Sequence, residues 1–241
     1  ERFTVIPRRG ELRFFDKHAR ALVDRIVLPV PSAKGKGVLV SPTIFGNVML
    51  GPTSENLVDR SDTSTSAEGF AFLTSKGRTI MPALLDEEVT ASYAGLRAAT
   101  EHSDYVVEVD PAQRYVLLGG IRSTGLTASM ALAERACDLM EAAGLSLHVR
   151  AGVPPPPRMP NIGEAFPRPY QRVDLIEHDP EYGTIVCFCE RVSRGEIRDA
   201  LRSPIPPCDA DGLRRRTRAL MGRCQGFFCG AEVEAMLREQ T

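Results

Sequence analysis

The sequence contains no tryptophan and only 5 tyrosines, so burial of apolar surface must rest on Leu, Val, Ile, Ala and Phe side chains. It has no apolar run near the roughly 20 residues that cross a bilayer, which excludes direct membrane insertion. Neither sign of charge dominates, because 30 Lys and Arg residues stand against 31 Asp and Glu residues, for a net charge of -1. This balance argues against a general nucleic-acid-binding protein.

Length and composition describe an ordinary globular chain. The 241 residues are 43% hydrophobic and 25% charged, enough for one large domain or two smaller ones. The first residue is Glu1 rather than a methionine, so we expect a fragment, a processed product or a trimmed chain. The lack of a signal peptide is then uninformative, since trimming would have removed it.

Two patterns in the first hundred residues predict local structure. The β-rich runs 37–43 and 48–52 lie on either side of Gly46-Asn47, which predicts a β-hairpin. Residues 64–75 have the composition of a helix, with Gly77 as its expected end.

A strand, a glycine-rich turn and a helix follow one another between residues 115 and 144. Residues 115–118 predict a short buried strand that runs into Gly119-Gly120. Beyond the turn, apolar residues recur at helical spacing from Leu126 to Met140, and Gly144 is the expected stop.

A proline-rich stretch then divides the chain. It contains the run Pro154–Pro157, and proline favours extended structure and cannot continue a helix. We therefore expect a linker over 151–182. Beyond it, Ser193 and Glu196 have the spacing of a capping box, Asp211 is expected to cap a helix toward Leu220, and residues 231–238 predict the last helix.

Cysteine is unevenly distributed. Of the 6 cysteines, Cys137 and Cys208 are isolated, and the rest form two tight pairs with 34 residues between them. Such clustering argues against a disulfide framework, and soft thiolates suit an iron–sulfur cluster or zinc. The spacing favours a cluster, with structural zinc and unligated buried cysteines as the alternatives. The pairs are Cys187 with Cys189 and Cys224 with Cys229.

Neighbouring residues suit an anionic cluster. Glycines around the second pair let backbone N–H groups approach the sulfurs. Arginines close in sequence would offset the negative charge of bound thiolates. These residues are Gly222, Gly226, Gly230, Arg214, Arg215, Arg216, Arg218 and Arg223.

The C-terminal motifs resemble a known family. Residues 185–192, with 211–218 and 221–229, are similar to the bacterioferritin-associated-ferredoxin-like [2Fe-2S] domain. More narrowly, they resemble the version at the C-terminus of FAD-dependent dehydrogenases such as the anaerobic glycerol-3-phosphate dehydrogenase large subunit. The likeness covers about residues 183–241 and fills every family cysteine position. It implies a [2Fe-2S] cluster held by Cys187, Cys189, Cys224 and Cys229.

The first 150 residues resemble the same group of enzymes, within the D-amino-acid-oxidase-like flavoprotein superfamily. Glycerol-3-phosphate and L-2-hydroxyglutarate dehydrogenases or oxidases are similar in the same places, and the resemblance implies an FAD cofactor. The segments that carry it are Pro7–Glu11, Asp16-Lys17, Gly37–Val40, Gly46-Asn47, Gly51–Thr53, Tyr93–Arg97 and Gly120–Thr127.

The resemblance assigns the glycine-rich turn to the flavin. In the family this turn faces the flavin ring, and a helix N-terminus offers free N–H groups and a positive dipole end that stabilise negative charge there. From the residues alone, an ordinary tight strand–helix turn is the alternative. The implied contacts are Gly120, Ser123, Thr124, Gly125 and Leu126.

Two arginines are candidates for substrate binding. The planar guanidinium of Arg97 or Arg122 suits a carboxylate or phosphate, because it binds such groups bidentately. An exposed or structurally paired arginine is the commoner fate of any single Arg.

One family feature is missing. The superfamily begins with a strand–Gly-x-Gly-x-x-Gly–helix unit that holds the ADP part of FAD, and this sequence has no such motif. We expect an upstream half, removed or supplied by another polypeptide, to provide it together with any general base. By itself the chain is expected to bind FAD poorly and to be inactive.

The predicted fold class is α+β. Residues 1–108 would form a mainly antiparallel substrate-binding sheet with helices, and residues 109–150 the returning strand and helix of an FAD domain. The linker over 151–182 and a small helical [2Fe-2S] domain over 183–241 complete the expected chain.

These inferences predict an FAD-dependent dehydrogenase, or part of one, that oxidises glycerol 3-phosphate or a small 2-hydroxy acid. Hydride would pass to the flavin, and single electrons to the cluster and on to a quinone, a ferredoxin-like protein or another subunit. The alternatives are an amine- or amino-acid-oxidising flavoprotein of the same superfamily, and a non-catalytic cluster or zinc module for the assembly of subunits. We expect a cytoplasmic protein that meets a membrane only through a partner.

Overall fold

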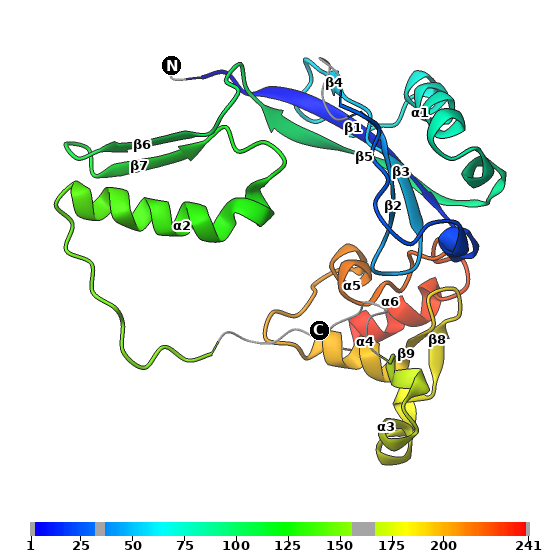
Figure 1. The fold of residues 1–241 in the computed structure, drawn as a ribbon. Coiled ribbons are helices and arrows are strands. Elements are labelled where there is room, and N and C mark those ends of the chain that lie inside the picture. The colour runs from blue at the N-terminus through cyan, green and yellow to red at the C-terminus, as the bar shows by residue number, and fades with distance from the viewer. Residues whose placement is uncertain (1–2, 32–36, 156–166, 240–241) are drawn as a thin grey trace. The chain divides into compact units, whose positions relative to one another are not determined.

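The computed structural model describes residues 3–31, 37–155 and 167–239 (Figure 1). The chain forms two compact units. The first consists of residues 1–12, 51–73 and 93–154, and the second of residues 13–50, 74–92 and 155–241. The predicted linker lies partly outside the described residues.

A 5-stranded sheet contains the first part of the chain. Its strands run in the order β2-β3-β1-β4, and β5 pairs with β1 (Figure 1). β1 is antiparallel to β3, where Phe15 lies opposite Val48, and to β4, where Arg9 lies opposite Glu55. The bounds are β1 Ile6–Phe15, β2 Leu39–Pro42, β3 Val48–Gly51, β4 Glu55–Asn56 and β5 Val89–Ala99.

The predicted hairpin over residues 37–52 is confirmed. β2 and β3 are neighbours in the sheet, and the N–H of Thr43 donates to the carbonyl oxygen of Asn47 at 2.8 Å across the turn. Val40, Val48 and Leu50 are fully buried, so the hairpin is held by the burial of its apolar face.

Helix α1 (Ala67–Ile80) differs from the predicted helix at both ends. Ser66 caps its start, because the hydroxyl of Ser66 accepts from the N–H of Gly69 at 3.0 Å. Gly77 does not end it. A Cβ at Gly77 would lie 3.0 Å from both Leu50 and Leu85, so this glycine serves close packing inside the helix. The prediction rested on the frequency of glycine just after helix ends, and here close packing places Gly77 within the helix instead.

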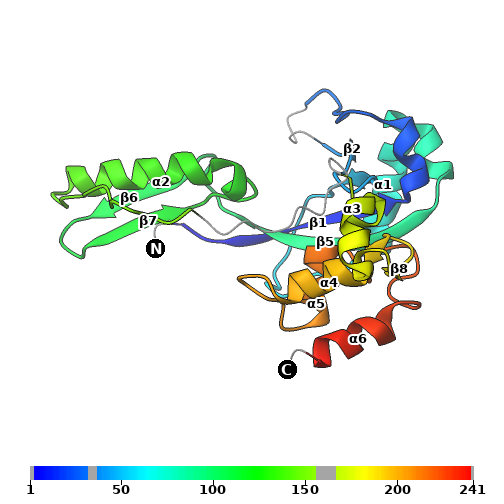
Figure 2. The ribbon, with the colours of Figure 1, turned by 90° about the horizontal axis from the view of Figure 1, so that it is seen from below.

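The first unit also contains a hairpin covered by a helix, residues 106–142, which we call the hairpin–helix segment. β6 (Val106–Asp110) pairs antiparallel with β7 (Tyr115–Gly119), and α2 (Gly125–Ala142) packs along both strands (Figures 1 and 2). Gly144, at φ 90°, follows the helix end as predicted. The predicted burial of residues 115–118 is wrong. Tyr115 is 48% exposed because β7 has one partner strand and one covering helix.

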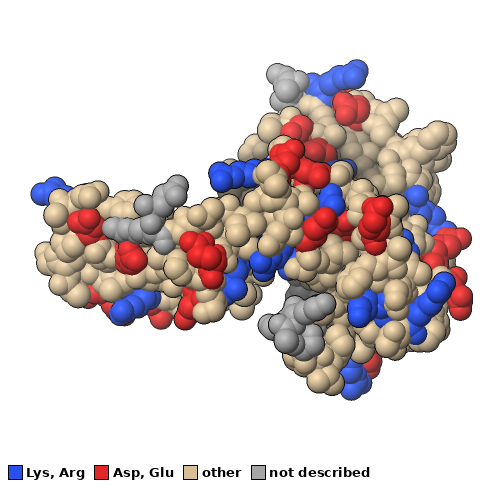
Figure 3. Space-filling view, turned by 90° about the horizontal axis from the view of Figure 1, so that it is seen from above, with Lys and Arg blue, Asp and Glu red and all other residues tan. Residues whose placement is uncertain are grey.

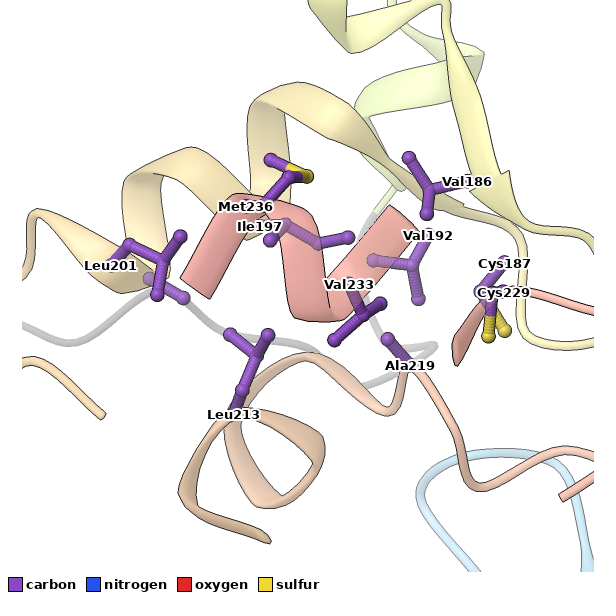
Figure 4. Close-up of a cluster of buried hydrophobic side chains, with 11 residues drawn as sticks. Val186, Cys187, Val192, Ile197, Leu201, Leu213, Ala219, Cys229, Val233 and Met236 are labelled. Carbon is purple, nitrogen blue, oxygen red and sulfur yellow. The ribbon is translucent and has the colours of Figure 1, made fainter. Parts of the chain in front are cut away.

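The last part of the second unit is a small helical assembly around one apolar core. Val192 of β9, Ile197 of α4, Leu213 of α5 and Val233 of α6 are fully buried and meet in this core (Figure 4). We call residues 185–239 the C-terminal segment. The elements from residue 169 onward are η3 Pro169–Gln171, α3 Val173–His178, η4 Pro180–Tyr182, β8 Ile185–Cys187, β9 Val192–Ser193, α4 Arg194–Leu201, α5 Ala210–Thr217 and α6 Gly230–Arg238.

Helix caps in this segment follow the sequence with one exception. The capping box of Ser193 and Glu196 is confirmed at the start of α4. Asp211 was predicted to cap the next helix, but Asp209 does so, since its carboxylate accepts from the N–H of Gly212 at 2.6 Å. That helix ends early because Arg218 adopts the left-handed conformation at φ 72°.

The surface and the element content agree with the composition. On the face in Figure 3, Lys and Arg side chains are interspersed with Asp and Glu, in keeping with the net charge of -1. Among the described residues, no helix combines the length and the apolar character that crossing a bilayer requires. Antiparallel sheets with several helices confirm the predicted α+β class.

Candidate functional site

The fold brings the paired cysteines to one end of the C-terminal core. Cys187 is the last residue of β8, and Cys189 follows in the turn to β9. Cys224 lies in the loop after α5, and Cys229 directly precedes α6. Positive backbone φ values at Gln225 (48°) and Gly226 (86°) turn this loop back between its two cysteines.

The thiols lie as an inner pair and an outer pair. Cys187 and Cys229 are 1% and 2% exposed and interact with each other beside the core (Figure 4). Cys189 and Cys224 are half-buried and form the outer pair. Within the described residues, no three His, Cys, Asp or Glu side chains are grouped as one metal ion would require. Two pairs of thiols are what two irons need, so the donor set fits a [2Fe-2S] cluster.

The two kinds of thiol differ electrostatically. Burial is the main cause that raises the pKa of Cys187 to about 11. The backbone N–H groups of Glu190 and Leu220 act in the opposite direction and lower this pKa. The pKa of Cys224 is lowered, chiefly by the backbone N–H of Phe228 and also by those of Gly226 and Phe227. The loop thus already favours the thiolate at Cys224, the form that binds metal.

The glycines around the second pair have different roles. A Cβ at Gly222 would lie 2.3 Å from the Cβ of Cys189, so the backbone there needs the absence of a side chain. Gly226 supplies a positive φ of 86° and an N–H toward Cys224. A Cβ at Gly230 would meet nothing within 4 Å, so packing does not require this glycine.

The predicted arginines divide into those that face the site and those that do not. Arg223 interacts with Cys189 and with Asp16, at 2.9 Å from the carboxylate of Asp16. Arg218 lies 3.3 Å from the buried carboxylate of Glu190, next to Cys189 in the chain. The remaining arginines of α5 have other partners: Arg214 and Arg215 pair with Asp211, and Arg216 donates to Ser203.

The glycine-rich turn has the geometry of an open helix start. Gly120, at φ 66°, leads into the turn, and Thr124 is the N-cap of α2 without a side-chain capping bond. The hydroxyl of Thr124 instead donates to the carbonyl of Ile121 at 3.0 Å. The first amides of α2 are therefore not occupied by a capping side chain. The other predicted contacts, Ser123, Gly125 and Leu126, lie at this helix start, and Leu126 is 93% exposed.

The guanidinium of Arg97, in the first unit, is partly buried and only some of its N–H groups have hydrogen-bond partners among the described residues. Its Nη2 donates to the carbonyl oxygen of Thr53 at 2.9 Å. Its Nε is buried and has no hydrogen-bond partner among the residues that the structure describes. Burial, and then the nearby charge of Arg8, lower the pKa of Arg97. A guanidinium in this state gains from an added anion.

Arg122 lies in a different setting. Its side chain is exposed, it has a positive φ of 58°, and its Nη2 donates to the carbonyl of Ser103. No described contact joins it to Arg97.

Sequence reasoning did not give a role to two residues of these sites. Arg8, which donates to Asn56 at 2.7 Å, adds positive charge beside Arg97. Glu190 is 4% exposed and is paired with Lys17 at 3.5 Å as well as with Arg218. Arg8 and Glu190 lie in segments that carry the family resemblance. The spacing of residues in those segments does not indicate which charged side chains the fold places next to Arg8 or Glu190.

Comparison with known proteins gives a family match for each of the two regions that contain a candidate site, the N-terminal region and the C-terminal segment. Residues 1–139 match the family model described as FAD dependent oxidoreductase, and residues 185–239 match the BFD-like [2Fe-2S] binding domain. The chain belongs to the FAD-dependent oxidoreductase family. It also carries a [2Fe-2S]-binding domain, so both predicted cofactors, FAD and the [2Fe-2S] cluster, are confirmed.

Individual relatives agree with this assignment. A glycerol 3-phosphate dehydrogenase of Caloramator mitchellensis is 35% identical over 239 residues, which is 98% of this chain and 49% of the relative. A glycerol 3-phosphate oxidase of Mycoplasma pneumoniae is 33% identical over 143 residues, 57% of this chain and 37% of the relative. The structure of FAD-bound L-alpha-glycerophosphate oxidase from Mycoplasma pneumoniae superposes with a TM-score of 0.50 at 31% identity, covering 58% of this chain and 37% of that one. The chain thus spans about half or less of the length of these relatives.

Proposed function

We propose that this chain is the substrate-side and electron-transfer portion of an FAD-dependent glycerol 3-phosphate dehydrogenase. The observation that carries the substrate is Arg97, a partly buried guanidinium beside a second arginine, with a buried Nε that lacks a partner among the described residues. Relatives named as glycerol 3-phosphate dehydrogenase and oxidase support the choice of a phosphate over a carboxylate. A small 2-hydroxy acid is the second substrate class that the same guanidinium would accept.

The residues of the chain divide the work as follows. Arg97 and Arg8 bind and orient the phosphate, with the Thr53 carbonyl fixing the plane of the Arg97 guanidinium. The turn at Gly120 and the open start of α2 at Gly125 would contact the flavin, and their amides would stabilise negative charge on it. Ser123, Thr124 and Leu126 complete that surface, and Arg122 is a second substrate-binding candidate.

The cysteine pairs supply the electron-transfer part. Cys187, Cys189, Cys224 and Cys229 hold the [2Fe-2S] cluster, and Arg223 offsets its negative charge. When bound, FAD would supply acceptance of a hydride from the substrate C–H bond, and the [2Fe-2S] cluster would supply single-electron transfer to a quinone, a ferredoxin-like protein or another subunit. The domains proposed for this work are residues 1–108, 109–150 and 183–241, with a linker over 151–182. A cytoplasmic location, with membrane association through a partner, belongs to the same proposal.

The test of the substrate is a comparison of glycerol 3-phosphate with glycerol in the full-length, cofactor-loaded enzyme. Arg97→Ala should lower kcat/KM for glycerol 3-phosphate by roughly 30-fold or more, equivalent to about 2 kcal/mol, because a desolvated charge pair is lost. Activity toward glycerol, which has no phosphate, should change little, and Arg97→Lys should recover part of the loss. Arg114→Ala, an arginine of the β6–β7 turn at φ 51°, is the matched control.

Two results would contradict the proposal. Equal losses toward glycerol 3-phosphate and glycerol in Arg97→Ala would show a structural role for the guanidinium. A parent enzyme that prefers a 2-hydroxy acid or an amino acid to glycerol 3-phosphate would assign the site to a carboxylate substrate.

A further inference from the structure

The loops that carry the cysteines also carry exposed phenylalanines. Phe188 lies between Cys187 and Cys189, and Phe227 and Phe228 precede Cys229. Their side chains are 62%, 96% and 67% exposed. Large apolar side chains gathered in this way on a surface mark a site of interaction rather than of stability.

Two of these rings are held in contact with each other. Phe188 and Phe228 form an edge-to-face pair with ring centroids 5.1 Å apart and planes at 86°. The pair joins the first cysteine loop to the second. We call Phe188, Phe227 and Phe228 the phenylalanine patch.

The patch lies where the thiols are least buried. Cys189 and Cys224 are half-buried and belong to the same loops as the patch, whereas the inner pair faces the apolar core. Electron tunnelling weakens steeply with distance, so a carrier must reach a bound cluster from the outer side. Phe188 and Cys189 line the same pocket, so the phenylalanine patch adjoins that side.

A basic pocket adjoins the patch within the second unit. It has a volume of about 340 Å³, and Phe188 and Cys189 line it together with Lys17, Arg168, Arg191 and Arg223. The acidic residues in its wall, Asp16 and Glu190, are each paired with a cation, at 2.9 Å from Arg223 and 3.3 Å from Arg218. Arg168 is likewise paired, with Glu196 at 2.7 Å. The four cations and two carboxylates of the wall therefore leave a modest formal surplus of positive charge next to an apolar patch.

We propose that the phenylalanine patch and the basic pocket form the docking surface for a soluble protein that carries one electron and is acidic around its redox centre. An apolar centre with a charged rim is the usual build of a protein–protein interface, and complementary charge increases the rate of encounter. The positive rim selects an acidic carrier over a basic one. This inference rests on the proposed [2Fe-2S] cluster. It adds which residues of this chain would contact the electron carrier and the sign of that carrier's charge.

The experiment measures binding rather than turnover. Oxidised flavodoxin, an acidic one-electron carrier, is titrated calorimetrically into the full-length oxidised holoenzyme, and basic cytochrome c serves as the carrier of opposite charge. Flavodoxin should bind, and its affinity should fall as salt is raised, because the rim charges are exposed. Phe227→Ser with Phe228→Ser should weaken this binding by at least about tenfold, as the loss of aromatic anchors does at an interface.

Controls separate docking from folding. Tyr115→Ser removes an exposed aromatic ring of β7 and should leave the affinity unchanged. The visible absorption of the cluster and the content of iron and sulfide should be the same in the parent and the double variant. If the double variant loses its cluster, Phe227→Ser alone, at the most exposed ring, is tested instead.

Each remaining outcome counts against the surface. Unaltered flavodoxin binding in the phenylalanine variants, an equal loss in Tyr115→Ser, or tighter binding of cytochrome c than of flavodoxin would overturn it. Oxidative footprinting that finds the rings of Phe227 and Phe228 already shielded in the free full-length enzyme would assign the patch to another segment of that enzyme. A failure of the proposed function looks different, since the parent protein would then lack iron and sulfide.

Discussion

The C-terminal segment and the hairpin–helix segment, which contain the two candidate cofactor sites, are built in opposite ways. α4 buries Ile197, Ala200 and Leu201 in a core shared with α5 and α6, and two of the four predicted cysteine ligands are part of that core. α2 is longer, yet none of its residues is buried, and Leu126 and Met130 are 93% and 76% exposed. A metal cluster needs thiols in fixed positions. In the C-terminal segment the apolar core fixes the thiols of Cys187 and Cys229.

The helix ends show the same contrast. α4 and α5 begin with side-chain caps, from Ser193 and Asp209, so their first amides are used internally. α2 begins without one. α6, whose N-cap is Cys229, also begins without a side-chain cap. The helix starts next to the two proposed cofactor sites thus keep their first amides free of capping side chains.

The largest expected difference between the two segments is the effect of a cysteine substitution on the iron and sulfide content. Cys229→Ser removes a buried thiol that we propose as a cluster ligand, so iron and sulfide should fall from about two of each per chain to a small fraction. Cys137→Ser, at an exposed position of α2, should leave both contents unchanged. Chemical analysis of anaerobically purified protein provides the check. Retention of a full iron content in Cys229→Ser would remove this residue from the ligand set.

The next largest effect tests whether only one region has a core. Leu213→Ala should lower the free energy of unfolding by about 2–5 kcal/mol, since Leu213 is fully buried. Met130→Ala in α2 should change it by less than about 0.5 kcal/mol. Denaturant unfolding monitored by circular dichroism measures both. Comparable losses at the two positions would mean that α2 has a hidden core contact.

A smaller effect should come from backbone packing. Gly222→Ala forces a methyl group against Cys189 and should cost about 1–3 kcal/mol, with a visible change in the cluster spectrum. Gly125→Ala at the start of α2 meets only a side-chain methyl of Ile121, at 3.6 Å, and should be neutral for folding. An unaltered spectrum and stability in Gly222→Ala would show that the loop adjusts freely.

The smallest effect concerns a single ion pair. Burial tends to raise the pKa of Asp16, but the N–H of His18 and the guanidinium of Arg223 outweigh it and hold that pKa below its usual value. The stabilisation is therefore present above pH ~4, the unfolded pKa, and is lost as the pH falls through the folded pKa. Asp16→Asn should cost about 1 kcal/mol at pH 7 and progressively less below pH ~4. Stability curves of the two proteins that stay parallel down to acid pH would contradict this.

Local patterns in the sequence predicted local features well. The β-hairpin around Gly46-Asn47, the capping box at Ser193 and the cysteine pairs each depend on neighbouring residues, and the structure shows the first two as expected. The errors arose where a distant contact decided the outcome. Gly77 stays inside α1 because Leu50 and Leu85 approach it, and Asp209 rather than Asp211 caps α5.

The sequence by itself determined the family, the four thiols and the glycine-rich turn, because these lie in contiguous motifs whose chemistry follows from residue type and spacing. Only the tertiary structure decided which thiols are inner and which are outer, since burial depends on β8, α5 and α6 meeting in one core. It likewise placed Arg8 beside Arg97, and Lys17 and Arg218 around Glu190. Charges far apart in the chain act on one another only after folding has brought them close, because electrostatic interaction depends on distance and burial.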